Sequence, residues 1–171
     1  TAMEMFRKES YSKAASQFHS IAKSYKDTPL EEDALFMEAE CNFKLERYPK
    51  AQDKYTELMT RYPTTRYMPQ AVQRTYDIAF FWLEDSRLRS QGQDAKHYAI
   101  TNRINLFDKK RPLLDTEGRA LEAIESIQTA EPTGPLSDDA LMMAGAHTFT
   151  NEDYVKAAGF SEFPKDTAGF L

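Results

Sequence analysis

The chain has 171 residues and a formal net charge of −5, and 41% of its residues are hydrophobic and 29% charged. This length is close to that of one domain, and the composition is ordinary for a globular protein. The mild negative charge argues against nucleic acid as the main partner. The longest apolar run, residues 78–83, is far shorter than the roughly 20 residues a membrane-spanning helix needs. A lone cysteine, Cys41, excludes an internal disulfide.

Alanine recurs at fixed separations along the chain. Three pairs are each 37 residues apart, namely Ala14 and Ala51 (51−14), Ala34 and Ala71 (71−34), and Ala120 and Ala157 (157−120). Small residues allow two helices to approach closely, so this spacing predicts paired helices in a repeated unit. Arrays of this kind are usually binding scaffolds rather than catalysts.

The first two predicted units span 1–27 and 28–64, and the first helix of unit one is cut to about residues 1–8. In unit two, Thr28 and Glu31 have the spacing of a capping box, which predicts a helix start at this point. The second helix of that unit is predicted to start near Tyr48 and to end at Tyr62, because Pro63 disfavours a helical conformation in the residue before it.

The third predicted unit, 65–85 and 116–133, is interrupted by an insert over 86–115. Ala71 and Ala120 are 49 residues apart where 17 are expected, so 32 residues are extra (49−17). The insert lacks clear helical periodicity and carries a local charge of +4, from seven basic and three acidic residues (7−3). Asp115 is a predicted N-cap for the helix that resumes after it.

The insert contains a candidate secondary contact, formed by Arg103, Lys109, Lys110 and Arg111. Clustered basic side chains suit an acidic partner or anionic lipid headgroups. A solvated loop is the favoured alternative, because charge runs usually have no other role.

The fourth predicted unit spans 134–171 and ends atypically. Tyr154 and Ala157 lie where a second helix should start, but Pro164 falls inside that helix and should break it.

The units resemble the tetratricopeptide repeat (TPR). Unit two matches this family at Ala39, Tyr48, Ala51, Tyr55 and Pro63, and unit four matches it at Gly145, Tyr154 and Ala157. The resemblance implies an all-α fold, a solenoid of stacked antiparallel helix pairs with about four units, the third interrupted by the insert.

A finer resemblance is to the outer-membrane assembly lipoproteins of the BamD (YfiO) family. It rests on the shared Tyr-x-Lys-Ala pattern at residues 11–14 and 48–51 and on Tyr-Pro-Thr-Thr at residues 62–65. The resemblance implies a scaffold at the periplasmic face of the outer membrane that holds protein or peptide segments, including outer-membrane assembly components. It also implies membrane attachment through a lipidated N-terminal cysteine, which this sequence does not contain, and the basic insert departs from the family pattern.

In this family, the first helix of each unit lines a concave groove that binds the partner. By position, the predicted groove residues are Arg7, Asp33, Phe36, Glu40, Lys44, Gln70, Gln73, Asp77, Phe81 and Met142. Aromatic side chains would supply contact area and carboxylates would orient a bound peptide. Chaperone-binding members hold a C-terminal carboxylate with Lys and Asn. Asp33, Glu40, Gln73 and Asp77 replace that clamp here, so we expect that activity to be absent.

Phe43, Phe80 and Phe149 lie at further groove positions of the first helices, but they could instead belong to the core. Repeated apolar positions mostly mark packing, so Phe43, Phe80 and Phe149 are expected to be buried. Phe36 and Phe81 remain open between the groove and the core by the same periodicity argument.

Catalytic motifs are not apparent in the sequence. The three histidines, His19, His97 and His147, lie far apart, and neither a phosphate-binding loop nor a nucleophile elbow occurs. We therefore expect a protein that is not an enzyme and has no cofactor or metal. Two alternatives remain: a general TPR adaptor in another complex or compartment, and an enzyme whose active site is completed by a further domain.

Overall fold

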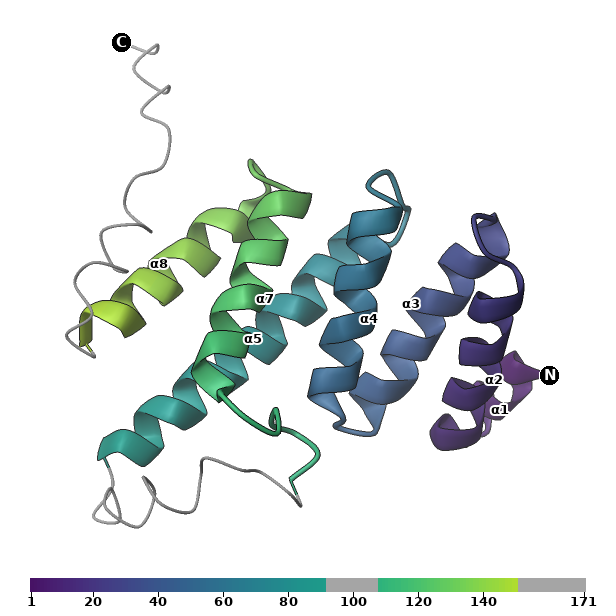
Figure 1. Ribbon diagram of the computed structural model, residues 1–171, viewed down its shortest axis with the longest axis horizontal. Coiled ribbons are helices and arrows are strands. Elements are labelled where there is room, and N and C mark those ends of the chain that lie inside the picture. Colours follow the sequence, from purple (N-terminus) through teal and green to yellow (C-terminus); the bar gives the residue numbers. More distant parts are fainter. Residues whose placement is uncertain (92–107, 151–171) are drawn as a thin grey trace, which may run out of the picture.

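A computed structural model describes residues 1–91 and 108–150, and every regular element in these residues is an α-helix (Figure 1). The helices, in chain order, are α1 (Ala2–Arg7), α2 (Tyr11–Ser24), α3 (Pro29–Lys44), α4 (Tyr48–Arg61), α5 (Met68–Gln91), α7 (Thr116–Ala130) and α8 (Pro135–Thr150). The predicted all-α class is therefore confirmed for the described part of the chain.

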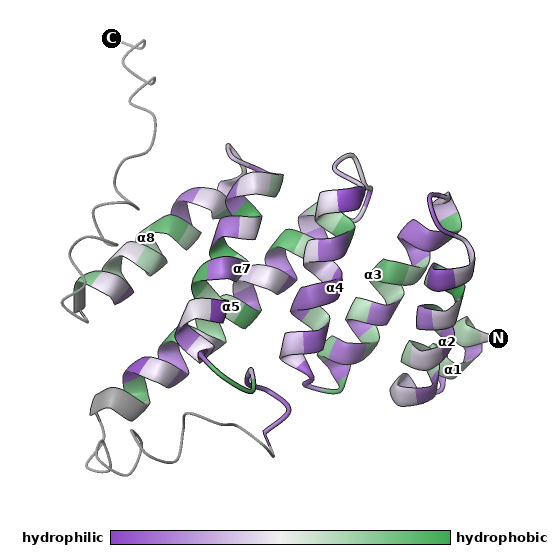
Figure 2. Cartoon of the chain, viewed as in Figure 1, coloured by the Kyte–Doolittle hydropathy of each residue, from purple (hydrophilic) through white to green (hydrophobic). Residues whose placement is uncertain are grey.

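The helices pack in series, because each contacts the next one along the described chain. Contacts also join α4 to α7 and α5 to α8. Hydrophobic residues recur at short intervals along the helices (Figure 2) and meet in the seams between them. The recurring alanines lie in these seams and are buried, namely Ala14, Ala34, Ala51, Ala71, Ala120 and Ala140. The burial of these side chains agrees with the predicted close contacts between helices. Ala157, the remaining alanine of the pattern, lies outside the described residues.

Helix boundaries repeat as the alanines do. Both the first and the last residues of α2 and α4 are 37 apart (48−11 and 61−24). The ends of α1 and α3 are also 37 apart (44−7). A sequence separation of 37 residues therefore corresponds to one helix pair over the first half of the molecule.

The turn inside each of the first two pairs is the same. After α3, the N–H of Arg47 donates to the carbonyl of Asn42 at 2.9 Å, and the N–H of Glu46 donates to that of Phe43 at 2.9 Å. This pattern is a Schellman motif, which requires a left-handed residue after the helix, and Glu46 has φ of 55°. The same bonds recur around Glu9, which has φ of 56°. The same turn geometry therefore recurs in both pairs and sets each helix antiparallel to its partner.

The start of α3 confirms one half of the predicted capping box and contradicts the other. Thr28 Oγ1 accepts from the N–H of Glu31 at 3.4 Å, so Thr28 is the N-cap. The carboxylate of Glu31 does not return to Thr28 but accepts from the N–H of Asp27 at 2.6 Å. It also accepts from Tyr62 Oη at 2.6 Å and from Arg61 Nη2 at 2.8 Å. The reason is tertiary, since α4 brings these two donors to Glu31.

Helix α5 is longer than the predicted unit. It continues to Gln91, so the range 86–115 is not free of helix, and the expectation drawn from its weak periodicity is wrong for residues 86–91. The chain is described again from Asp108, where it lies against α5. Trp82 Nε1 donates to the carbonyl of Lys110 at 2.7 Å, and Arg111 pairs with Asp85 at 2.8 Å.

The predicted cap at the start of α7 is confirmed. Asp115 Oδ1 accepts from the N–H of Gly118 at 2.8 Å, and Asp115 has a left-handed φ of 51°. A Cβ at position 118 would lie too close to the Asp115 carboxylate, so a larger residue there would require the capping side chain to move. The predicted break at Pro164 and the second helix around Tyr154 and Ala157 lie outside the described residues.

Candidate functional site

A cavity of about 380 Å³ opens between α3 and α5. Its lining residues are Phe36, Glu40, Pro69, Gln70, Gln73 and Arg74. Four of them, Phe36, Glu40, Gln70 and Gln73, were predicted as groove residues from their repeat positions. We call the surface formed by Asp33, Phe36, Glu40, Gln70, Gln73, Arg74 and Asp77 the groove face.

The polar side of the groove face is held by ion pairs and hydrogen bonds. Glu40 Oε1 accepts from Tyr55 Oη at 2.5 Å and from Arg74 Nε at 3.1 Å. Burial, followed by the nearby Glu40 charge, raises the pKa of Tyr55, so its hydroxyl remains a donor at neutral pH. Asp77 accepts from Gln73 Nε2 at 2.9 Å. These contacts fix the carboxylates and leave the exposed amide of Gln70, and the oxygen and second N–H of the Gln73 amide, to meet a ligand.

Arg74 was missed by the sequence analysis. Its guanidinium carbon lies 4.4 Å from the centre of the Phe43 ring while Nε binds Glu40, so it joins α5 to α3. The residue 37 positions earlier is Met37, which suggests a packing position (74−37). No signal in the repeat pattern marks Arg74, because its role depends on the neighbouring helix.

The aromatic side of the groove face is a stacked pair. The rings of Phe36 and Tyr67 lie 4.0 Å apart at an interplanar angle of 6°. Tyr67 Oη donates to Asp33 at 2.9 Å, and Arg66 Nη2 donates to the same carboxylate at 2.6 Å. Burial raises the pKa of Tyr67, so this hydroxyl also stays protonated. Asp33, predicted as a ligand-orienting carboxylate, is therefore already bound to two donors.

A second cavity, of about 420 Å³, lies on the other side of Tyr67. Its lining is mostly apolar and comprises Thr1, Ala2, Met3, Phe18, Ile21, Leu30, Asp33, Ala34, Met37, Arg66 and Tyr67. Asp33 is thus shared between this cavity and the groove face, and Tyr67 lines this cavity while its ring stacks on Phe36 of the groove face. The two cavities differ in chemistry, since one presents amides and the other presents aliphatic and thioether groups.

The remaining predicted groove residues do not line the cavity between α3 and α5. Arg7 and Lys44 are exposed at the ends of α1 and α3, and Met142 on α8 is 75% exposed. Phe81 is partly buried and makes an edge contact with Tyr48 at 5.3 Å. Phe36 is likewise partly buried against the core.

The expected burial of the repeated phenylalanines is wrong at two positions. Phe80 is 49% exposed and Phe149 is 64% exposed. Phe43 is partly covered because the turn after α3 brings Tyr48 against it at 5.5 Å and Arg74 lies over its ring. Since α5 continues past Phe80 without such a turn, no equivalent of Tyr48 covers that ring within residues 1–91 and 108–150.

Two residues of the candidate secondary contact have structural partners. Lys110 pairs with Glu46 at 2.9 Å, and Arg111 pairs with Asp85 and with Asp108 at 3.0 Å. Lys109 is exposed, and Arg103 lies outside the described residues. The basic segment is therefore partly used to hold the chain against α5 and the turn after α3.

The cysteine and the two described histidines are buried or lie against carboxylates of the fold, and no catalytic arrangement is formed by them. Cys41 is buried, and burial raises the pKa of its thiol to about 12, which makes it a poor nucleophile. His19 Nδ1 lies 3.1 Å from Glu38, and His147 Nε2 lies 3.3 Å from Glu117. Within residues 1–91 and 108–150, no group of three or more acidic, histidine or cysteine residues is arranged to hold a metal ion.

Comparisons with known proteins add no assignment. No protein-family model matches the chain, and no curated protein sequence matches it either. Among the helices of the described residues, none combines the length and the apolar character needed to cross a membrane.

Proposed function

We propose that the chain is a protein-interaction scaffold of the TPR type that holds protein segments on the groove face. The observation that carries the proposal is the cavity between α3 and α5, which gathers Phe36, Glu40, Gln70 and Gln73 from distant repeat positions. The exposed amides can bond to a peptide backbone, and Phe36 offers an apolar surface beside them. Support for the TPR solenoid comes from the repeated helix boundaries and the buried alanines.

The finer proposal is that this scaffold resembles the outer-membrane β-barrel assembly lipoproteins at the periplasmic face of the outer membrane. Its support is the Tyr-x-Lys-Ala pattern and the Tyr-Pro-Thr-Thr segment at residues 62–65. In the structure, Tyr62 ends α4 and donates to Glu31, so this tyrosine has a structural role in closing the helix pair. A partner would be a component of that assembly machinery or one of its substrates.

A site-specific cross-linking experiment tests both levels of the proposal. A photoreactive amino acid placed at Gln73, which is exposed on α5, should capture a bound segment in cells, and the same residue at Gln17 on α2 is the matched control. We expect products at position 73 that identify an outer-membrane assembly component. Recovery of a cytosolic complex would favour a general TPR adaptor instead, and equal labelling at both positions would place partner binding elsewhere.

A further inference from the structure

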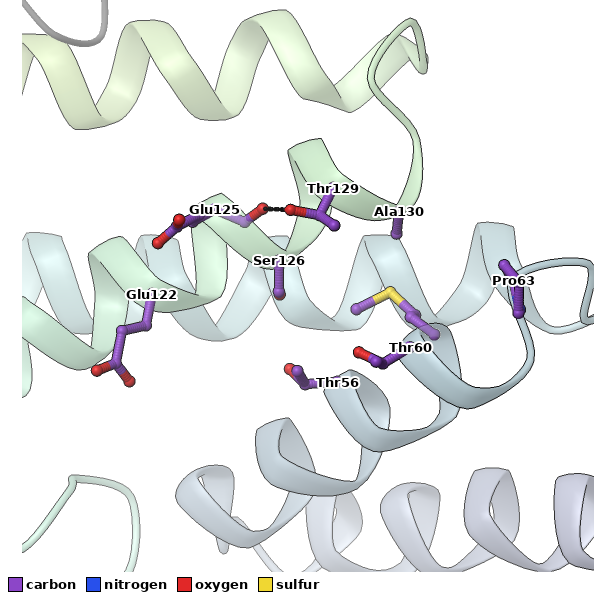
Figure 3. Close-up of a pocket in the computed structure, with 9 residues that line it drawn as sticks. Thr56, Thr60, Pro63, Glu122, Glu125, Ser126, Thr129 and Ala130 are labelled. Atoms are coloured by element: carbon purple, nitrogen blue, oxygen red, sulfur yellow. Dashed lines mark hydrogen bonds between the residues drawn. The ribbon is translucent and has the colours of Figure 1, made fainter.

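A third cavity lies between α4 and α7, and it shares no residue with the groove face. Its volume is about 380 Å³, and Figure 3 shows Ser126 of α7 directed toward Thr56 and Thr60 of α4. The lining residues are Thr56, Met59, Thr60, Pro63, Glu122, Glu125, Ser126, Thr129 and Ala130.

Two of the four hydroxyl groups that line this cavity present only acceptors to a ligand. Ser126 Oγ donates to the carbonyl of Ala123 at 2.7 Å, and Thr129 Oγ1 donates to that of Glu125 at 3.0 Å (Figure 3). Thr56 Oγ1 accepts from Gln52 Nε2 at 2.9 Å and keeps a further lone pair. Because the hydroxyls of Ser126 and Thr129 donate their protons to carbonyls of their own helix, their oxygens can only accept hydrogen bonds from a ligand.

The charge of the lining is negative. Glu122 and Glu125 are exposed at the rim, and no basic residue belongs to the lining. The nearby Arg119 donates to Gln52 at 2.6 Å and pairs with Asp53, and it also pairs with the rim carboxylate of Glu122 at 3.4 Å. The negative charge of Glu122 is therefore shared with Arg119. The cavity therefore combines carboxylates and several acceptors with only two hydroxyl donors, those of Thr56 and Thr60.

The base of the cavity is apolar. Met59 is only 3% exposed, and Pro63 and Ala130 lie beside it. A ligand that fits this lining has an aliphatic part for the base and a cationic donor for the rim. Lysine and arginine side chains have this construction, because an apolar stem carries several N–H donors at its end.

We propose that the cavity between α4 and α7 is a second docking surface, which takes a lysine or arginine side chain from a basic segment of a partner protein. The stem packs on Met59, Pro63 and Ala130, and the cationic end donates to the Thr and Ser oxygens and to Glu122 and Glu125. Charge complementarity sets the choice of partner, since a cationic group placed at two carboxylates is favoured and an acidic segment is repelled.

The probe for this surface is a 12-residue peptide of arginine and leucine, compared with the same peptide in which citrulline replaces each arginine. Citrulline keeps the shape of the side chain and removes its charge. Binding to the ¹⁵N-labelled chain is followed by amide chemical shifts. We expect shifts at Thr60, Ser126 and Thr129 with the arginine peptide and at least about fivefold weaker binding of the citrulline peptide.

Two variants examine the rim and the cavity separately. Replacing both carboxylates, Glu122→Gln with Glu125→Gln, should weaken binding of the arginine peptide by about tenfold, because two partly exposed ion pairs are lost. Thr60→Trp keeps both carboxylates and fills the mouth of the cavity, so it should abolish the shifts at Ser126 and Thr129.

The control variant removes the same amount of negative charge from a different part of the surface. Asp138→Asn with Asp139→Asn removes two exposed carboxylates from α8 and should leave binding unchanged. The proposal is overturned if both double variants weaken binding equally, if the citrulline peptide binds as well as the arginine peptide, or if the shifts fall on the groove face.

Discussion

At the scale of single residues, Glu31 shows how a buried charge is kept in this fold. Its side chain is almost fully buried, and Tyr62, Arg61 and the N–H of Asp27 all donate to it. Burial raises the pKa of Glu31, but the hydrogen bonds from Tyr62, Arg61 and Asp27 outweigh it, so the pKa lies below its ordinary value. The ends of α3 and α4 are thereby joined through one carboxylate.

A lowered pKa makes the contribution of Glu31 to stability depend on pH. The contribution is present above the ordinary glutamate pKa of 4.5 and is lost as pH falls through the lower value in the folded protein. At pH 7 we expect Glu31→Gln to lower the free energy of unfolding by about 2 kcal/mol, because charge-assisted hydrogen bonds are weakened. Urea titrations of both proteins between pH 7 and pH 3 should show this difference shrinking below about pH 4.5. A constant difference over that range would contradict the assigned charge.

At the scale of elements, α3 and α5 occupy equivalent repeat positions but end differently. α3 stops at Lys44 in a Schellman turn, whereas α5 continues to Gln91. The longer helix provides Trp82 and Asp85, which hold the returning segment at Lys110 and Arg111. The extension thus replaces the missing turn as the anchor for the chain that leads into α7.

The Trp82 hydrogen bond to Lys110 can be removed with a smaller aromatic ring. In Trp82→Phe, the Lys110 carbonyl loses its donor and the smaller ring leaves a void at a fully buried position, so we expect a loss of about 2 kcal/mol in stability. Brief trypsin digestion should then cut after Lys109 and Lys110 faster than in the unchanged protein. Tyr76→Phe, a substitution on the same helix, serves as the control and should leave the cleavage rate unaltered. Equal cleavage of all three proteins would show that this bond does not hold the segment.

At the scale of the whole molecule, stability depends on contacts between neighbouring helices. Each helix packs on the next, and few helices that are distant along the chain meet. Arg119 makes one of the longer connections, because it links α7 to Gln52 and Asp53 of α4. In arrays of stacked elements, such links determine whether the parts unfold together.

Removing the Arg119 connection should loosen this coupling. We expect Arg119→Met to lower stability by about 1 kcal/mol and to broaden the urea transition, since α4 and α7 are then joined by fewer contacts. Lys50→Met, at an exposed position on α4, is the control and should leave the transition unchanged. A loss of stability with an unaltered transition slope would mean that the molecule unfolds as one unit without this link.

Local pattern explains which features could be predicted. The spacing of alanines predicted which small residues face a neighbouring helix, as Ala51 and Ala71 do, because a helix presents residues of one face at regular intervals. The caps at Thr28 and Asp115 were predicted for the same local reason. Repeat positions also identified Phe36, Glu40, Gln70 and Gln73, which share the cavity between α3 and α5.

The sequence by itself therefore determined the helical class of the described residues, the helix caps and the alanines that face a neighbouring helix. Tertiary structure alone decided that Phe43 is covered while Phe80 is exposed, that Arg74 binds Glu40, and that Glu31 receives donors from α4. The physical reason is that periodicity depends on residues within a few turns of one helix, whereas exposure and pairing depend on whichever distant segment the fold brings alongside.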